Sequence, residues 1–365
     1  MVYKLIQYIL RVYLPVFFKR LEFRGLSNVP KDKPVIFAVN HQNAFLDGIL
    51  VALKLNRPIY FLTRSDVFKG KLTVKVLNAL NLIPIFRQQD RTGDIKENNR
   101  KTFQYCIDKL ENSGAVLIFP EGVSEPIHHC FNLKKGVARL AFEAEEQNNF
   151  KLKLHVVPVA INYENHFIAG KKVFVSFLRP ILMSEYRNVF NDSKSRAQSV
   201  FLKRLQGELR ANLIHISGDY TRFKRRYWKG IVLQSRNDME MIAAVKSIPQ
   251  EKGLNTDGYN WKLDKYKYNR PRSSFAKIFS FLISLPGFII FSPTILITKL
   301  LVLKVKDAAF YLSVVCLSWL LFGLIQLTII AFYLWSISEL EFFIASMLVV
   351  QLLGYLSIKN FYKIF

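Results

Sequence analysis

The sequence predicts an α/β fold: a mostly parallel sheet with flanking helices, together with an amphipathic N-terminal helix and C-terminal membrane helices. Two observations support this prediction. Short apolar runs of strand length alternate with helical stretches between residues 24 and 163, which is typical of a parallel sheet covered by helices. Residues 275–365 contain long uncharged apolar runs, which is typical of segments that enter a membrane.

Five apolar runs have the length of buried strands: residues 34–39, 58–63, 82–86, 115–119 and 156–161. Four helical candidates lie between them: residues 46–55, 72–80, 96–110 and 133–145. In open α/β sheets a ligand binds just outside the carboxyl ends of the strands. The segments that directly follow these strands are therefore the expected location of a site.

The composition combines a strongly basic character with a strongly apolar one. The 365 residues include 52 Lys and Arg against 27 Asp and Glu, a net charge of +25, and 51% are hydrophobic. Such an apolar content excludes an intrinsically disordered protein. The three cysteines, Cys106, Cys130 and Cys316, are odd in number and far apart, which excludes a disulfide-stapled secreted domain.

Charge and apolar residues are segregated along the chain. Residues 1–274 carry 46 Lys and Arg against 24 Asp and Glu, whereas residues 275–365 carry only nine charged side chains. Three uncharged runs fill that last region: residues 278–298, 308–338 and 342–358. A membrane span needs about 20 apolar residues, so these runs predict a membrane region, with buried core helices as the alternative.

The charges around these runs predict their topology. Residues 299–307 are basic, whereas Glu339 and Glu341 lie in the turn between the second and third runs. The positive-inside rule then makes residues 308–338 and 342–358 a hairpin whose acidic turn lies outside. The first run, 278–298, has basic flanks at both ends and contains Pro286 and Pro293. We therefore expect it to be re-entrant or to lie in the membrane interface.

Two further segments are expected to contact an anionic membrane surface. Residues 1–22 interleave apolar residues with Lys4 and Arg11, which indicates an amphipathic helix on the membrane or, alternatively, a helix packed on the body. Residues 191–274 form a basic helical extension in which Lys and Arg alternate with Tyr and Trp. A solvated helical face or a nucleic-acid surface would share this pattern, but the apolar tail disfavours nucleic acid. Residues 23–190 would then be the catalytic α/β domain.

Residues that could take part in catalysis or binding follow three of the predicted strands. His41 and Asp47 follow the first strand, and a His with an Asp can act as a general base and its orienting carboxylate. Six positions on a regular helix correspond to a rotation of roughly 240°, so His41 must precede the helix for the two to meet. Arg87 follows the third strand and offers a planar fork for phosphate. Glu121 and Gly122 follow the fourth strand.

The order of these segments resembles the glycerolipid acyltransferase superfamily, which includes lysophosphatidic acid and glycerol-3-phosphate acyltransferases. The matching blocks are Asn-His followed by Asp47, Ile-Pro-Ile-Phe-Arg ending at Arg87, Phe-Pro-Glu-Gly at residues 119–122, Lys-Lys-Gly at 134–136 and Val-Pro-Val at 157–159. Five residues separate His41 from Asp47, where the commonest family pattern has four. The chain is thus similar to a subgroup with the longer spacer, which includes glycerol-3-phosphate and dihydroxyacetone-phosphate acyltransferases.

The resemblance implies acyl transfer from an acyl-CoA or acyl carrier protein to a hydroxyl of glycerol-3-phosphate or a lysophospholipid. The basic segments beside the membrane region predict that the domain lies on the cytoplasmic face of the membrane. His41 would be the general base and Asp47 its orienting partner. Arg87 would hold the phosphate. Glu121 and Gly122 would shape the acceptor site, and Lys135 or its neighbour Lys134 would add positive charge. Apart from the thioester co-substrate, no cofactor and no metal are expected.

Other classes of function compete with this interpretation. A covalent acyl-enzyme would need an activated nucleophile, but no Gly-x-Ser-x-Gly elbow is present, and Ser124 and Cys106 have no evident base. A metal site could use His41, Asp47, His128 and His129, although no helical two-His spacing supports it. A membrane scaffold or polyanion-binding protein without catalysis would be expected to lose some of these site residues.

Overall fold

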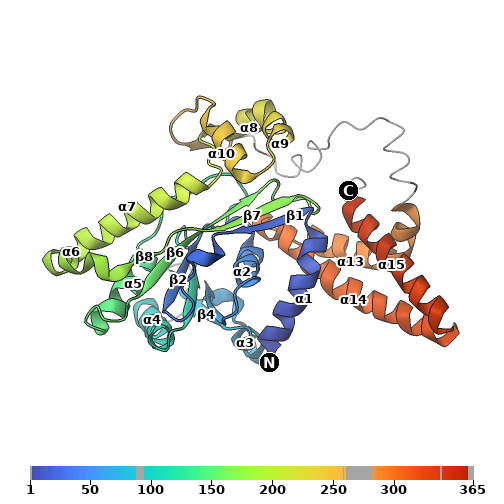
Figure 1. Ribbon diagram of the computed structural model, residues 1–365, viewed down its shortest axis with the longest axis horizontal. Coiled ribbons are helices and arrows are strands. Elements are labelled where there is room, and N and C mark those ends of the chain that lie inside the picture. Colours follow the sequence, from blue (N-terminus) through green and yellow to red (C-terminus); the bar gives the residue numbers. More distant parts are fainter. Residues whose placement is uncertain are drawn as a thin grey trace.

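The computed structural model describes residues 2–87, 94–257, 259, 282, 284–337 and 339–360. Its centre is an eight-stranded sheet in the order β1-β7-β6-β2-β5-β3-β4, with β8 paired to β6 (Figure 1). The strands are β1 (Arg20–Arg24), β2 (Val35–Val39), β3 (Ile59–Arg64), β4 (Leu82–Ile85), β5 (Ala115–Ile118), β6 (His155–Tyr163), β7 (Lys172–Phe177) and β8 (Ile181–Leu182). The five predicted strands correspond to β2 to β6, which confirms the α/β class.

The central strands are parallel, so their carboxyl ends share one edge of the sheet. Strand β2 pairs in parallel with β5 and β6, and β3 pairs in parallel with β4 and β5. The antiparallel pairs are β6 with β7 and β6 with β8. The segments after β2, β3, β4, β5 and β6 therefore meet along the same edge.

Helices cover both faces of the sheet, as the alternation of side chains along β2 requires. Val35, Phe37 and Val39 point to one face, where α1 (Val2–Phe17), α2 (Ala44–Ala52) and α14 (Tyr311–Ile337) pack. Ile36 and Ala38 point to the other face, under α4 (Ile95–Glu111), α5 (Gly136–Gln147) and α7 (Lys194–Asn212). Further helices are α3 (Lys71–Ala79) and α6 (Arg187–Asp192).

Helix α1 presents two different apolar faces. One face packs into the core through Leu14 and Phe17, which are fully buried. The opposite face exposes Leu5, Tyr8 and Val12, each by 60% or more. The packed face agrees with the alternative of a helix on the body, whereas the exposed face has the composition of a membrane-surface helix. Its contact with a membrane stays a prediction.

A small helical unit follows α7. It contains α8 (Tyr220–Phe223), a π-helical turn at Lys224–Trp228, α9 (Lys229–Gln234) and α10 (Asp238–Lys246), which share a separate apolar cluster. Helix α7 lies within the predicted basic extension, but its Phe201 and Leu205 pack into the core of the sheet. Residues 258 and 260–274, the later part of that extension, lie outside the described residues.

The C-terminal region is helical and mostly apolar. A helix at Ser284–Ile290 and α13 (Ser292–Leu303) meet at a bend of 74°, the geometry of a broken span or a re-entrant loop. The start of the predicted re-entrant run, residues 278–281 and 283, lies outside the described residues. Helix α15 (Leu340–Asn360) follows α14 as the second arm of a hairpin (Figure 1).

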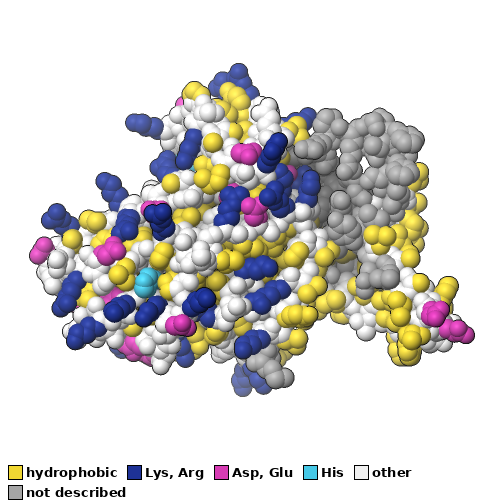
Figure 2. Space-filling model, in the orientation of Figure 1, with side chains coloured by type: hydrophobic (Ala, Val, Ile, Leu, Met, Phe, Trp, Pro, Cys, Tyr) yellow, Lys and Arg dark blue, Asp and Glu magenta, His cyan; other side chains and the backbone are white. Residues whose placement is uncertain are grey.

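By length and composition one described helix, Ala308–Ile337, could cross a membrane, and the number rises to two if the bent pair is one span. Only 28% of its most apolar window is buried, whereas a core helix of a soluble protein is mostly buried. The buried part is the N-terminal part of α14, around Leu312 and Val315, whereas Ile329 and Phe332 farther along are exposed. Figure 2 shows hydrophobic side chains on the surface of the projecting C-terminal helices, whereas Lys and Arg side chains are distributed over the surface of the α/β body.

Candidate active site

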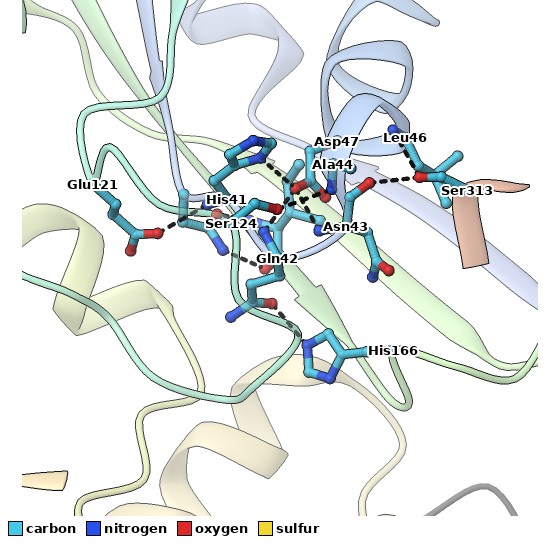
Figure 3. Close-up of polar contacts among 12 residues, drawn as sticks. His41, Gln42, Asn43, Ala44, Leu46, Asp47, Glu121, Ser124, His166 and Ser313 are labelled. Atoms are coloured by element: carbon cyan, nitrogen blue, oxygen red, sulfur yellow. Dashed lines mark hydrogen bonds and ion pairs between the residues drawn. The ribbon is translucent and has the colours of Figure 1, made fainter. Parts of the chain in front are cut away.

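A tight turn connects β2 to α2; it carries His41, and the first turn of α2 carries Asp47, the two predicted catalytic residues (Figure 3). Asn40 fixes the end of β2, because its side-chain amide exchanges two hydrogen bonds with the backbone of Ile161 on β6, at 2.7 and 3.0 Å. His41 lies before α2, and Asp47 lies in the first turn of that helix. His41 thus precedes the helix, which was the condition for the two side chains to meet.

The His41 ring and the Asp47 carboxylate are in direct contact. His41 Nδ1 lies 3.0 Å from Asp47 Oδ2, and the Asp47 side chain is fully buried. Because a carboxylate only accepts hydrogen bonds, Nδ1 carries the proton and Nε2 is left with its lone pair. Nε2 has no hydrogen-bond partner among the described residues, and the ring, stacked on Phe119 with centroids 3.7 Å apart, remains partly exposed. The pair therefore presents a base to the outside.

Asp47 is held from several directions. Its Oδ2 accepts hydrogen bonds from the backbone N–H groups of Gln42 and Asn43, at 2.7 and 2.8 Å. Its Oδ1 accepts one from the Tyr163 hydroxyl at 2.7 Å. Burial, together with the neighbouring Asp47 charge, raises the pKa of Tyr163 well above its usual value, so this hydroxyl stays protonated and donates.

Glu121 supports the same turn from behind. Its carboxylate accepts hydrogen bonds from the backbone N–H of His41 at 3.0 Å and of Phe131 at 3.2 Å, and its side chain is buried. Burial raises the pKa of Glu121 to about 8. The two backbone N–H groups lower this pKa, whereas the Asp47 charge raises it further. The structure therefore links Glu121 to the backbone of the turn that carries His41.

This raised pKa predicts a pH-dependent stability. The folded protein holds the Glu121 proton up to about pH 8, whereas the unfolded chain releases it near pH 4.5. The stabilisation is therefore complete below pH 4.5 and is lost as the pH rises from there to about 8. We expect Glu121→Gln to flatten the fall of the thermal midpoint between pH 5 and 8, measured in detergent. An equal fall of the thermal midpoint in Glu121→Gln and in the wild type would contradict a raised pKa of Glu121.

Gly122 and Lys135 lie on the loop and helix that follow Glu121. Gly122 has a φ of +70°, and an added Cβ would lie 3.2 Å from the side chain of Lys134. The backbone N–H of Lys134 donates to the carbonyl of Pro120 at 2.7 Å, which closes the loop. Lys135 is exposed at the N-terminus of α5. Gly122 therefore shapes this loop, and Lys135 adds charge at its surface.

Arg87 lies on the same edge of the sheet, but it does not adjoin His41. Strand β4 is three strands away from β2 in the sheet order, a distance of about 14 Å at the usual strand spacing. Between them, after β3, Arg64 binds Asp66 through two nitrogens at 2.5 and 3.1 Å. Arg87 Nη2 lies 3.8 Å from the same carboxylate. The fold therefore gathers two arginines around Asp66, on the same edge of the sheet as His41.

His128 and His129 do not join the His41–Asp47 pair. His128 is buried, with Nε2 2.7 Å from the carbonyl oxygen of Tyr163, and His129 Nδ1 lies 2.8 Å from the carbonyl oxygen of Ile216. Within the described parts of the chain, no group of three or more His, Cys, Asp or Glu side chains could hold a metal ion. The hydrogen bonds of these two histidines give them structural roles.

Several supporting residues were missed by the sequence reasoning. No site residue was predicted after the fifth strand, but β6 continues to Tyr163, whose hydroxyl donates a hydrogen bond to Asp47. Ser124 was considered only as a nucleophile, yet its Oγ accepts a hydrogen bond from the backbone N–H of Ala44 at 3.1 Å. Only the position of Tyr163 at the carboxyl end of a predicted parallel strand could have signalled such a role.

Comparison with known proteins agrees with this geometry. Residues 20–162 match the family model described as Acyltransferase. The chain is 30% identical over 115 residues to glycerol-3-phosphate O-acyltransferase 2 of Saccharomyces cerevisiae, covering 31% of this chain and 15% of that protein. It is 31% identical over 135 residues to a 1-acyl-sn-glycerol-3-phosphate acyltransferase of Chlamydomonas reinhardtii, covering 35% and 36%. The chain thus spans 15% of the length of the first curated relative and 36% of the length of the second.

A solved structure is also similar to the chain. The crystal structure of the 1-acyl-sn-glycerophosphate acyltransferase from Thermotoga maritima has a TM-score of 0.41 and 23% identity, covering 57% of this chain and 80% of that one. The family match spans β1 to β6 and contains His41, Asp47, Arg87 and Glu121. Residues 20–162 therefore form an acyltransferase domain, in agreement with the resemblance of the chain to the glycerolipid acyltransferase superfamily.

Proposed function

We propose that the protein is a membrane-bound O-acyltransferase that moves a fatty acyl chain from acyl-CoA or acyl carrier protein to a hydroxyl of glycerol-3-phosphate or a lysophospholipid. The observation that carries this proposal is the His41–Asp47 contact of 3.0 Å at the carboxyl edge of the sheet. The two curated relatives, named as acyltransferases of glycerol-3-phosphate and of its 1-acyl derivative, support the class of acceptor.

In the proposed reaction His41 acts as general base. Its Nε2 removes the proton from the acceptor hydroxyl while that oxygen attacks the thioester carbonyl. The tetrahedral intermediate then collapses, the C–S bond breaks, and the leaving thiolate takes the proton from the imidazolium. Asp47 stabilises this imidazolium and fixes the ring, because it contacts Nδ1. An ester and a free thiol result, and His41 returns to its neutral form.

The two arginines that contact Asp66 are proposed to bind the acceptor phosphate. Arg87 and Arg64 lie on the same edge as His41 and face a shared carboxylate, Asp66. A phosphate could take the place of that carboxylate, since the guanidinium fork fits both groups.

Arg87→Ala is therefore expected to raise the KM for a phosphate-bearing acceptor by about tenfold or more, since a charged hydrogen bond contributes roughly 1.5–3 kcal/mol. The KM for the thioester should change little. Arg100→Ala, which removes an exposed arginine on α4 that pairs with Glu97, serves as the matched control. An unchanged acceptor KM in Arg87→Ala would place the phosphate elsewhere.

Membrane binding is part of the proposal. Three features support it: the apolar helix Ala308–Ile337, the exposed apolar face of α1 and the net charge of +25. Basic side chains near an anionic leaflet contribute roughly 1 kcal/mol each, which favours a catalytic domain on the cytoplasmic face. Lipid acceptors would then reach the site from the membrane.

A panel of acceptors tests the proposed function. Glycerol-3-phosphate, lysophosphatidic acid and a lysophospholipid are supplied in turn with one labelled acyl chain, carried either by CoA or by acyl carrier protein. We expect the label to enter an ester of at least one acceptor, and the consumed pair identifies both substrates. Failure of the folded, membrane-bound protein to consume any pair would reject the proposal.

A further inference from the structure

Ser313, on the apolar helix α14, contacts the catalytic turn directly. Its Oγ donates a hydrogen bond to the backbone carbonyl of Asn43 at 2.7 Å and accepts one from the backbone N–H of Leu46 at 3.3 Å (Figure 3). Ser313 is fully buried. It lies 267 residues from Leu46 and outside residues 20–162, which match the acyltransferase family.

The turn that Ser313 contacts needs external support. Asn43 occupies the N-cap position of α2, but its side chain makes no capping hydrogen bond. Ala44 has a φ of +43°, a conformation that costs a non-glycine residue free energy. The hydroxyl of Ser124 accepts a hydrogen bond from the N–H of Ala44 itself, and the hydroxyl of Ser313 binds the carbonyl of Asn43 and the N–H of Leu46 on either side of it. Ser313 therefore supplies part of the capping that the turn lacks.

The same turn sets the geometry of the catalytic pair. The N–H of Asn43 binds Asp47, and the carbonyl of Asn43 binds Ser313. A displacement of this peptide segment would therefore shift Asp47 relative to His41. Misplacement of a catalytic group by about 1 Å can cost on the order of 10²-fold in rate.

Helix α14 is held firmly enough to act as a support. One turn after Ser313, the backbone carbonyl of Cys316 accepts a hydrogen bond from the Tyr13 hydroxyl of α1 at 2.8 Å. Leu312 and Val315 are fully buried in the same core cluster as Leu46 and Leu50 of α2. Beyond this docked part, the helix runs on into its exposed apolar half.

We infer that Ser313 is a positioning residue for the His41–Asp47 pair, and that the docked N-terminal part of α14 belongs to the active site. The C-terminal apolar region would then be required for turnover as well as for membrane attachment. This inference rests on the proposed acyl transfer, in which His41 is the base.

The test compares Ser313→Ala with Ser318→Ala, which removes another buried hydroxyl from the same helix. Both full-length variants are placed in vesicles of phosphatidylethanolamine and phosphatidylglycerol and are assayed beside the wild type and His41→Ala. We expect kcat of Ser313→Ala to fall roughly ten- to hundredfold, with KM for both substrates within about twofold of wild type, as for an interaction that acts only in the transition state. Ser318→Ala should retain the wild-type kcat.

A wild-type kcat in Ser313→Ala, or a loss equal to that in Ser318→Ala, would overturn the inference while leaving the proposed function intact. If the wild type itself transfers no acyl group, the proposed function fails, and a second readout decides the positioning role. This readout is the rate at which diethyl pyrocarbonate modifies His41, followed by peptide mass spectrometry. The rate in the Ser313→Ala protein should then equal the rate in the Asp47→Asn protein. A rate equal to the wild type would overturn the inference.

Discussion

His41→Ala is expected to lower kcat for acyl transfer by about 10²–10⁴-fold, the usual contribution of a positioned general base. The ring is the partly exposed group of the pair, with Nε2 available and Nδ1 held 3.0 Å from Asp47. The substitution removes little packing apart from the stack on Phe119, so the protein should stay folded and bound to the membrane. Incorporation of a labelled acyl chain and flotation with liposomes measure the two properties separately.

His155→Ala is the matched control for this result. His155 is also partly exposed, but it begins β6 and therefore lies at the opposite edge of the sheet. Its removal should leave kcat unchanged. Turnover that survives in His41→Ala, with normal binding to liposomes, would exclude His41 as the base.

Asp47→Asn is expected to lower kcat by about 10²-fold or more while the fold persists. The amide oxygen can still accept hydrogen bonds from the N–H groups of Gln42 and Asn43, and the amide NH₂ can face the Tyr163 hydroxyl, which is able to accept. The substitution removes the negative charge that stabilises the imidazolium. Activity should therefore fall far more than the thermal midpoint.

Asp47→Ala separates the two roles of this residue. It leaves the buried N–H groups of Gln42 and Asn43 and the hydroxyl of Tyr163 without their acceptor, at a cost of roughly 1–3 kcal/mol for each unsatisfied group. We expect this protein to lose both activity and stability, the latter measured by its thermal midpoint in detergent. Equal kcat values in Asp47→Asn and wild type would contradict the electrostatic role.

The central part of the fold could be predicted because parallel strands leave a clear trace in a sequence. Each of β2 to β5 is followed by a helix that returns the chain to the edge where the strands begin, so apolar runs and helices alternate. Strands β7 and β8 extend the sheet on the far side as antiparallel partners of β6. Antiparallel strands need no crossover helix between them. The alternation of apolar runs and helices in the sequence therefore did not predict β7 and β8.

The contact between His41 and Asp47 could be predicted because the two residues are neighbours in the sequence, and their spacing limits how they can meet. Its supports could not, since they come from remote segments: Glu121 and Ser124 follow β5, Tyr163 ends β6, and Ser313 begins α14. Glu121 was expected at the acceptor site, and the structure places its carboxylate on the backbone of the turn. Only tertiary packing determines which backbone group a buried carboxylate meets.

The most direct test of the account follows one labelled acyl group through a single turnover of the wild-type protein, with and without a phosphate-bearing acceptor. If His41 activates the acceptor hydroxyl, the label passes from the thioester directly to the acceptor, and without acceptor it stays on the thioester. Label that becomes covalently attached to the protein before the acceptor is added, and moves to it afterwards, would contradict a direct transfer with His41 as base.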